Sequence, residues 1–394
     1  MNTKLFKNAC LVFPAERIAT GSLLVRDGKI VALDPREIPL GAVTIDCRGR
    51  MLTPGLIDLH THGIQKFRYD YDTSPEDFAA AARVLGQYGT TCVFPTLVPR
   101  DEPNLVANLC RLPAALPRNG GCVGAWMPGV HLEGPFVALG GAACATKPGD
   151  LQLLDDLLVA CEHRVAIMSI SPDQKNILPV IERLCERGIV PFITHTRASV
   201  EQTQDAIAAG AVHATHFYDV FPVPEETEPG ARPVGAVETI LADRRVSVDF
   251  ICDGVHVHPM AIRAAVAAKG PQGVILITDS NIGAGLPPGE YETPWGFKVR
   301  VRAGDAARHV TENFLAGSAL TMDVGMKNLF RWLELPPEQI WAMGTLNPAR
   351  VMGLKHKGRI AVGADADLVL WDDDLVPVTT WVGGRIIYQR EVNE

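Results

Sequence analysis

The sequence predicts an α/β fold, a (β/α)8 TIM-like barrel joined to a small β-sandwich domain built from both chain ends. In the middle of the chain, short apolar runs alternate with helical patterns, which is typical of parallel βαβ units. Eight such runs are present, and eight parallel strands close a barrel. The two ends show short strands and tight turns instead. An open doubly wound sheet is the competing fold for the middle of the chain.

Both chain ends are rich in short β-like runs. Near the N-terminus, two apolar runs flank Asp27-Gly28, a pair that favours a two-residue hairpin turn. The C-terminal end repeats this pattern around Gly383-Gly384. Two β-rich ends around a long middle indicate one sheet domain assembled from both termini. The expected ranges are 1–52 and 346–394 for the small domain and 53–345 for the barrel.

Helix start signals separate the predicted barrel strands. Ser74 precedes Pro75, which combines a capping serine with a proline at the first helical position. Ser199 and Gln202 form a capping-box pattern, and Pro259 can begin another helix. The predicted strands lie near residues 55–60, 90–97, 122–131, 165–170, 189–195, 211–216, 246–252 and 273–278.

The composition indicates an ordinary globular protein. Of its 394 residues, 47% are hydrophobic and 21% are charged, which is enough apolar material for a large core. The net charge of −8 argues against binding to nucleic acid or to an anionic membrane. The N-terminal segment lacks an apolar stretch long enough for a signal peptide, and no segment approaches a transmembrane span. The nine cysteines are scattered with no C-x-x-C pair, so the cytoplasm is the expected location.

The first predicted barrel strand ends in two histidines, His60 and His62. Side chains at i and i+2 of a strand share one face, so both imidazoles leave the strand end in the same direction. Neutral imidazole nitrogens ligate zinc at about 2.0–2.1 Å, and two of them make half of a tetrahedral site. Paired strand histidines are also often ordinary buried residues. This pair alone therefore leaves metal binding and a structural role equally open.

Further ligand-type side chains close four other predicted strands. In a (β/α)8 barrel the carboxyl ends of the strands meet at one rim, where the chemistry takes place. Packing alone rarely places so many such residues at strand ends, so the set favours a metal-dependent hydrolase. His131 and His213, in contrast, lie inside their strands and are expected to be hydrogen-bonded structural residues. The rim residues are His60, His62, Glu133, His195, His216 and Asp279.

Short motifs surround these side chains. They are Pro54-Gly-Leu-Ile-Asp-Leu-His-Thr-His-Gly63, His131-Leu-Glu-Gly-Pro-Phe136, His213-Ala-Thr-His216, Asp253-Gly-Val-His-Val-His-Pro259, Thr278-Asp279, Ala316-Gly-Ser-Ala-Leu-Thr321, Asn347-Pro-Ala-Arg350 and Lys357-Gly-Arg-Ile360. As a set, these motifs resemble those of the amidohydrolase superfamily, and within it those of the N-acetylglucosamine-6-phosphate deacetylases. The resemblance runs through most of the chain and is more specific for the fold and the metal chemistry than for the substrate.

The resemblance implies a metal centre with one or two ions. Glu133, His195 and His216 would hold the main ion. His60 and His62 would hold a second ion beside it, and Glu133 is able to bridge the two. Zinc fits the histidine and carboxylate ligands best, while iron, cobalt and manganese stay open.

The same resemblance assigns catalytic roles to Asp279 and His256. Asp279, which is also counted among the metal ligands, would take the proton from the attacking water and pass it to the departing amine. His256 would polarise the carbonyl and stabilise the oxyanion. The implied reaction removes the acetyl group from an N-acetyl amino sugar, N-acetylglucosamine 6-phosphate or a close relative. The alternative is a deacylase or cyclic-amide hydrolase for a different substrate, with or without a phosphate.

Positions expected to contact the substrate depart from the family pattern. The family has an arginine before a Glu-Pro-Gly motif, and this chain has Thr227 there. The family's Asn-Ala pair after the sixth-strand histidine is Asp219-Val220 here, which places a negative charge near any phosphate. Arg197 and Arg232 are candidates to bind an anion from a new direction. The alternative is that both arginines are solvated loop residues.

The resemblance also implies a homodimer, in which a neighbouring subunit can complete the pocket. A scaffold protein that has lost catalysis is the non-enzymatic alternative. Such proteins usually lose metal ligands, whereas this chain keeps every expected ligand position, so the sequence favours an enzyme. Its expected partner is a small N-acyl amino sugar, with no nucleic acid and no membrane.

Overall fold

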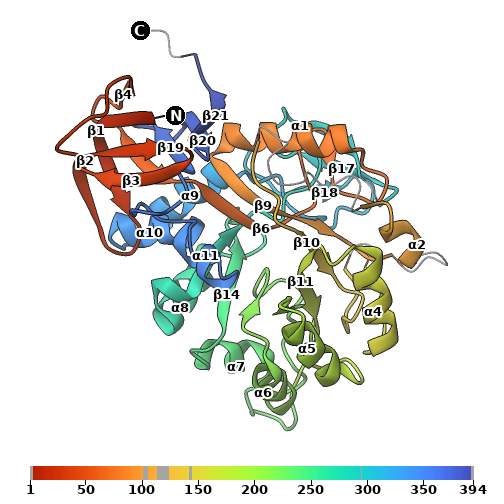
Figure 1. Cartoon of the computed structure of the whole chain (residues 1–394). Helices are drawn as coiled ribbons and strands as arrows, with labels where there is room; N and C mark the ends of the chain where they lie inside the picture. Colours follow the sequence, from red (N-terminus) through yellow and green to blue (C-terminus); the bar gives the residue numbers. More distant parts are fainter. Residues whose placement is uncertain (1–2, 101–104, 113–123, 142–143, 294, 392–394) are drawn as a thin grey trace.

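The computed structural model describes residues 3–100, 105–112, 124–141, 144–293 and 295–391, and a parallel barrel lies at its centre (Figure 1). Eight parallel strands follow one another around the barrel in chain order. The two ends of this row meet at Thr61 and Ser280, where the His62 amide donates to the Ser280 carbonyl at 2.8 Å. This closure confirms the predicted barrel and excludes an open sheet. The strands are β6 (Leu56–Thr61), β9 (Thr90–Leu97), β10 (Val130–Glu133), β11 (Val165–Ile170), β12 (Val190–Ile193), β13 (His213–Ala214), β14 (Ser247–Ile251) and β15 (Val274–Ile277).

The barrel strands are covered on both faces, which explains their apolar sequences. Every residue of β6, β9, β10 and β15 is buried. Two predicted strands are shorter than expected. The third begins only at Val130, because Pro128 before it has no N–H to donate to a ladder; residues 122–123 lie outside the described part. The sixth is reduced from 211–216 to His213–Ala214, and the chain then turns at the rim.

Helices cover the outside of the barrel, and α4 to α8 form a ring around its lower half in Figure 1. The predicted starts are confirmed. Ser74 accepts a hydrogen bond from the Asp77 amide at 3.1 Å, and Ser199 forms the capping box with Gln202. Pro259 begins a helix that buries Ile262, Ala265 and Val266. The helices are α1 (Pro75–Leu85), α2 (Leu105–Leu109), α4 (Leu151–Ala160), α5 (Ile177–Glu186), α6 (Val200–Ala209), α7 (Ala236–Ala242), α8 (Pro259–Lys269), α9 (Met322–Trp332), α10 (Pro337–Gly344) and α11 (Leu346–Val351), with short 3-10 turns at Gly86–Tyr88 and Pro271–Gly273.

Strands from both chain ends form one eight-stranded sheet, and Figure 1 shows the red and blue segments side by side. The predicted hairpins are both present. Asp27 and Gly28 have φ of 49° and 84°, and Gly383 and Gly384 have 53° and 68°, the left-handed values that such tight turns need. The order is β21-β20-β19-β5-β1-β2-β3 with β4 beside β1, for β1 (Thr3–Phe13), β2 (Arg17–Arg26), β3 (Lys29–Leu33), β4 (Val43–Asp46), β5 (Met51–Pro54), β19 (Leu368–Trp371), β20 (Pro377–Val382) and β21 (Arg385–Gln389).

This sheet has a hydrophobic core of its own. Phe6 and Trp381 come from opposite ends of the chain, and their rings meet edge to face with centroids 5.0 Å apart. The sheet is joined to the barrel where the Gly55 amide, just before β6, donates to the Asp367 carbonyl at 2.9 Å, and where the Thr380 hydroxyl donates to the Gly86 carbonyl at 2.7 Å. The small domain therefore holds the start of β6, the strand whose other end carries His60 and His62. The domain limits at residues 52 and 345 stay a prediction.

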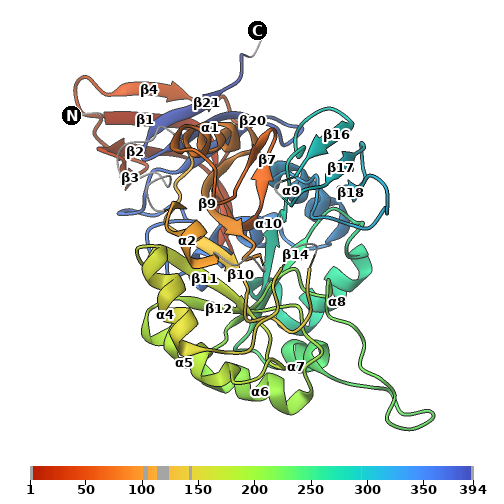
Figure 2. The ribbon, with the colours of Figure 1, turned by 90° about the vertical axis from the view of Figure 1, so that its right-hand side faces the viewer.

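A small antiparallel sheet follows the last barrel strand, and the sequence analysis did not predict it. Figure 2 shows it at the edge of the barrel. It places Trp295 next to the rim, where the indole packs against His62 with centroids 5.1 Å apart. No helix in the described ranges is long and apolar enough to cross a membrane. The strands are β16 (Gly289–Glu292), β17 (Lys298–Val301) and β18 (Arg308–His309), and a further short pair is β7 (Gly63–Ile64) and β8 (Phe67–Arg68).

Candidate active site

The two histidines at the end of β6 converge, as their i, i+2 spacing predicts. Their Nε2 atoms lie 3.3 Å apart, and their side chains are almost completely buried. The Nδ1 atom of His62 lies 3.2 Å from the carbonyl oxygen of Thr96, to which it can donate. Because Nδ1–H is used in this way, the Nε2 lone pair of His62 faces the barrel axis.

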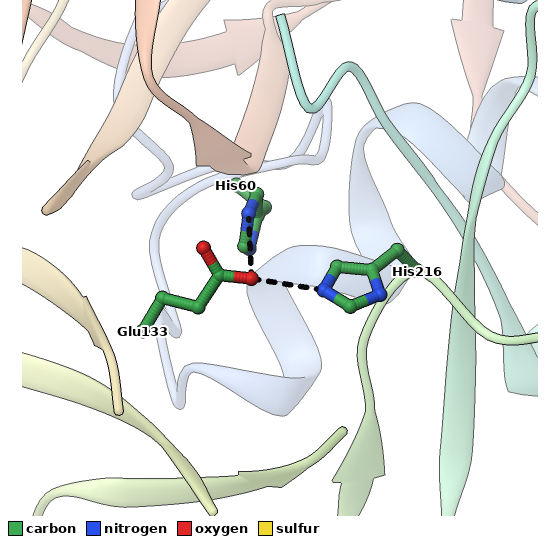
Figure 3. A group of neighbouring side chains, drawn as sticks. All are labelled: His60, Glu133 and His216. Carbon is green, nitrogen blue, oxygen red and sulfur yellow. Dashed lines mark hydrogen bonds and ion pairs between the residues drawn. The ribbon is translucent and has the colours of Figure 1, made fainter. Parts of the chain in front are cut away.

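The carboxylate of Glu133 lies at the centre of the cluster. Its Oε1 atom is 3.1 Å from His216 Nε2, 3.2 Å from His195 Nε2 and 3.8 Å from His60 Nε2. Figure 3 shows His60 and His216 pointing at this oxygen from two sides. The other oxygen, Oε2, is 3.3 Å from His62 Nε2. The Glu133 carboxylate thus lies within 3.8 Å of an Nε2 atom of each of the four rim histidines.

Asp279 completes the cluster directly after β15. Its Oδ1 atom lies 3.4 Å from His60 Nε2 and 3.3 Å from His62 Nε2. The backbone here is left-handed, with φ of 45°, and the Asp279 amide donates to the His60 carbonyl at 2.9 Å. Oδ1 is buried, and apart from these two long contacts no described residue donates to it. A buried carboxylate oxygen without a donor needs a cation or a proton beside it.

Hydrogen bonds behind the rim fix the ring orientations. The Nδ1 atom of His195 lies 3.0 Å from the carbonyl oxygen of Leu139, which leaves Nε2 toward Glu133. The fully buried Asp249 accepts from the His216 amide at 2.5 Å and from Thr215 Oγ1 at 2.9 Å. Such outer partners determine where a ligating nitrogen points.

His131 and His213 are structural residues, as predicted. His131 contacts the Leu59 carbonyl and Ser169 Oγ through its two ring nitrogens, at 3.1 Å and 2.8 Å. His213 contacts Ser247 Oγ at 2.7 Å and Asp249 Oδ2 at 2.8 Å. Both nitrogens of each ring are therefore engaged by the protein.

The donor set fits a divalent metal ion. Two groups of ligand atoms lie close enough to hold one, His60 with Glu133 and His216, and His60 with His62 and Asp279. Burial lowers the pKa of His62, but its hydrogen bonds to Asp279 and Glu133 outweigh this and raise the pKa to about 9. The buried carboxylates of Glu133 and Asp279 are thus stabilised by nearby positive charge, which either protons on the imidazoles or a metal ion can supply. Nitrogen and carboxylate donors in this arrangement suit zinc and similar metals.

His256 faces the cluster from the loop after β14. Asp253 accepts from the His256 amide at 3.0 Å, and its other oxygen lies 2.7 Å from His256 Nδ1. Burial lowers the pKa of His256, but this hydrogen bond and the negative charges of Asp253, Asp219 and Asp279 outweigh burial, and the net shift is upward. The same carboxylate therefore orients the imidazole and favours its protonated form.

A pocket of about 250 Å³ opens onto these side chains. It is lined by His62, Glu133, His195, His216, His256 and Asp279, together with the predicted substrate positions Asp219 and Val220. Further lining residues include Cys144 and Trp295, and neither they nor the supporting Asp249 were expected from the sequence. The available signal for Asp249 was an acidic residue inside an otherwise apolar strand, β14.

The other three predicted substrate positions lie outside this pocket. Thr227 and Arg232 are exposed on the loop between β13 and α7, which extends away from the barrel in Figure 2. The Arg232 guanidinium pairs with Glu238 at 3.4 Å, and the arginine side chain is 84% exposed. Arg197 lines an adjoining groove. Substrate roles for these three residues stay predictions.

The sequence matches the model of a family of known proteins, and this match agrees with the metal-binding geometry of the rim. The amidohydrolase family model matches residues 51–387, which include the barrel and most of the C-terminal strands. The chain belongs to the amidohydrolase family. Members of this family depend on a bound metal, which agrees with the clustered histidines and carboxylates.

Relatives within the amidohydrolase family are similar over almost the whole chain. The N-acetylglucosamine-6-phosphate deacetylase of Bacillus subtilis is 31% identical and covers 98% of this chain and 97% of its own. The human enzyme of the same name is 30% identical and covers 97% of this chain and 95% of its own. The similarity predicted from the motifs is thus confirmed.

Solved structures give the same result. A mutant of N-acetyl-D-glucosamine-6-phosphate deacetylase from Mycobacterium smegmatis, in complex with N-acetyl-D-glucosamine-6-phosphate, matches with a TM-score of 0.85. It is 27% identical to this amidohydrolase and covers 98% of this chain and 100% of its own. A D-hydantoinase, at 16% identity and a TM-score of 0.66, covers 98% of this chain and 95% of its own and shares the fold.

Proposed function

We propose that this amidohydrolase removes the acetyl group from an N-acetyl amino sugar, N-acetylglucosamine 6-phosphate or a close relative. One observation carries the proposal. Four histidine Nε2 atoms and two carboxylates converge at the barrel rim, in a chain that is similar end to end to deacetylases of this substrate. The products are acetate and the free amino sugar.

In this proposal Glu133, His195 and His216 hold the main metal ion, and His60 and His62 hold a second. Asp279 contacts the metal site from the end of β15, the strand beside β6. A bound divalent metal polarises the amide carbonyl and lowers the pKa of water toward neutrality. Zinc fits the donors best, and iron, cobalt or manganese can also bind imidazole and carboxylate ligands.

Asp279 acts as the proton carrier. Burial raises the pKa of its carboxyl, but hydrogen bonds and charge from His60 and His62 outweigh burial and hold the pKa well below its usual range. The carboxylate is therefore ionised at neutral pH and can accept the proton of the attacking water. It then passes this proton to the nitrogen of the leaving amine, which is a poor leaving group as an anion.

His256 binds the carbonyl oxygen of the amide. Asp253 holds its Nδ1, so Nε2–H is the donor available to the substrate. The upward shift of the His256 pKa favours the protonated ring, and a cationic donor stabilises the negative charge that develops on the oxygen. The role requires no movement of the ring, because it is already held on the pocket wall.

The chain is further proposed to act as a homodimer in the cytoplasm. In a dimer, the exposed loop that carries Thr227 and Arg232 can contribute to the pocket of the neighbouring subunit. Asp219 and Val220 contact the substrate within the subunit's own pocket. A different acyl amine or a cyclic amide on the same metal centre is the second candidate, and the shared barrel of the D-hydantoinase favours testing it.

Acetate release by the metal-loaded enzyme tests the proposal. We expect turnover of N-acetylglucosamine 6-phosphate or N-acetylglucosamine, and none of hydantoin or dihydrouracil. Asp279→Asn serves as the inactive control for contaminating deacetylase. Turnover of the cyclic amides without turnover of either sugar would contradict the proposal and support the second candidate.

A further inference from the structure

A second groove continues outward from the catalytic pocket. It has a volume of about 450 Å³ and shares two lining residues, Gly140 and Val220, with the pocket. Its other walls include Leu139, Tyr218 and Phe221. These apolar and aromatic side chains form a surface against which the carbon face of a sugar ring can pack. The groove thus provides room that the inner pocket of about 250 Å³ lacks.

Arg197 supplies positive charge to this groove. Of the lysines and arginines in the described part of the chain, Arg197 is the one that lines either cavity. Its backbone amide donates to Asp173 Oδ2 at 3.1 Å, and Asp173 also accepts from the neighbouring Thr196 hydroxyl. No described residue forms a hydrogen bond or ion pair with its guanidinium. The backbone is therefore anchored while the charged group is left for another partner.

The distance from Arg197 to the rim cluster is comparable to the length of a small substrate. It follows His195 by two residues, so their Cα atoms lie within about 7 Å of each other along any chain path. His195 Nε2 lies 3.2 Å from Glu133 at the centre of the rim cluster. A molecule of the size of a sugar can thus have its amide at the cluster and a charged substituent at Arg197.

The inner pocket is unsuited to a phosphate. The side chain of Asp219, a carboxylate, lines this pocket. A dianion placed beside Asp219 meets like-charge repulsion. Thr227 is exposed on the long loop, and Arg232 is paired with Glu238 there. Within one subunit, an anion is therefore favoured on the Arg197 side.

We propose that Arg197 and the groove beside it bind the phosphate of the substrate, an N-acetylated amino sugar phosphorylated at the end remote from its acetamide. This inference rests on the function proposed above. The planar guanidinium can donate two parallel hydrogen bonds to phosphate oxygens. Tyr218 and Phe221 then contact the sugar ring between the phosphate and the acetamide.

Steady-state kinetics of the metal-loaded enzyme on N-acetylglucosamine 6-phosphate and on N-acetylglucosamine test this subsite. The wild type should prefer the phosphorylated sugar. Arg197→Ala should raise its KM for that sugar by about 10-fold or more, with kcat and the kinetics on the neutral sugar little changed, because a hydrogen bond to a charged group is lost. Arg197→Lys keeps the positive charge but loses the paired guanidinium donors, so its KM for the phosphorylated sugar should lie between those of the wild type and Arg197→Ala.

Arg244→Ala is the matched control. Arg244 is also exposed, but it lies just before the amino end of β14, at the barrel end opposite the rim. This variant should keep the wild-type preference. Equal use of both sugars by the wild type, or an unchanged preference in Arg197→Ala, overturns the subsite while the deacetylase function stands.

Calorimetry separates the subsite from the proposed reaction. If neither sugar is hydrolysed, the proposed function fails, and binding of N-acetylglucosamine 6-phosphate to the metal-loaded enzyme then decides on the subsite. Binding that Arg197→Ala weakens by about 10-fold supports it. No detectable binding, or equal binding by both proteins, overturns it.

Discussion

The Nε2 atoms of His60 and His62 lie 3.3 Å apart at the end of β6. Two neutral imidazoles cannot both present lone pairs at this distance without a positive charge between or beside them. The carboxylate oxygens of Glu133 and Asp279 approach the same atoms at 3.3 to 3.8 Å. The alternation of a strand thus puts half of a metal site on one tripeptide, and other strands of the barrel supply the rest.

Replacing both His60 and His62 by alanine should remove one half of this site. We expect the metal bound per chain to fall and the affinity of that half to drop by more than about 100-fold, beyond the 10–100-fold that outer partners cost. Elemental analysis after dialysis measures this. Glu133, His195 and His216 remain in the variant, so loss of all metal would show that the two halves form one inseparable site.

Asp279→Asn should lower kcat by about 10²–10⁴-fold, the usual contribution of general acid–base catalysis. The amide keeps an oxygen toward His60 and His62 but cannot carry a proton between water and amine. Because Asp279 also belongs to one of the two ligand groups, kcat is compared per bound metal ion, with the metal content of each protein measured. A variant with more than a tenth of the wild-type kcat would remove Asp279 from the proton-carrying role.

Asp249→Asn should weaken metal binding by about 10–100-fold, although Asp249 is not a ligand. Its carboxylate accepts from the His216 amide and from Thr215 Oγ1, and so it positions the His216 ring. Titration with zinc under a competing chelator measures the change. Asp323→Asn is the matched control, because Asp323 is also buried but bonds to Thr321 on α9 at 2.6 Å. Equal losses in both variants would indicate general destabilisation.

The barrel and its rim were predictable because they depend on local rules. Strand–helix alternation identifies the eight strands, and the rim positions are the one to three residues after the last apolar residue of each strand. His60, His62, Glu133, His195, His216 and Asp279 all occupy such positions. Their convergence then follows from barrel closure, with no knowledge of side-chain packing.

Residues that reach the site from elsewhere were not predictable in this way. Asp249 lies within β14 and acts through a neighbouring strand, so its partner depends on strand register. Trp295 comes from the loop between β16 and β17, whose placement depends on packing against the barrel. Arg197 and Arg232 look alike in the sequence, and the fold alone separates the residue that lines a groove from the one paired with Glu238.

The pH dependence of turnover should report on Asp253. Its carboxylate lies 2.7 Å from His256 Nδ1 and raises the pKa of that ring against the opposing effect of burial. His256 donates to the carbonyl only when protonated, so this contribution is present at low pH and is lost as the pH rises through its raised pKa. Asp253→Asn lowers that pKa, and the alkaline limb of kcat against pH should therefore move to lower pH.

The raised pKa of His256 also makes the stability of the fold depend on pH. A histidine whose pKa is raised on folding stabilises the native state below its unfolded pKa, and this stabilisation disappears as the pH rises through the folded pKa. Asp253→Asn should therefore be more destabilised relative to the wild type in acid than in alkali, measured by thermal unfolding. His256→Asn removes the titrating ring and should abolish both pH effects. An unshifted alkaline limb in Asp253→Asn, with His256→Asn still showing that limb, would assign it to another group and contradict the role of His256.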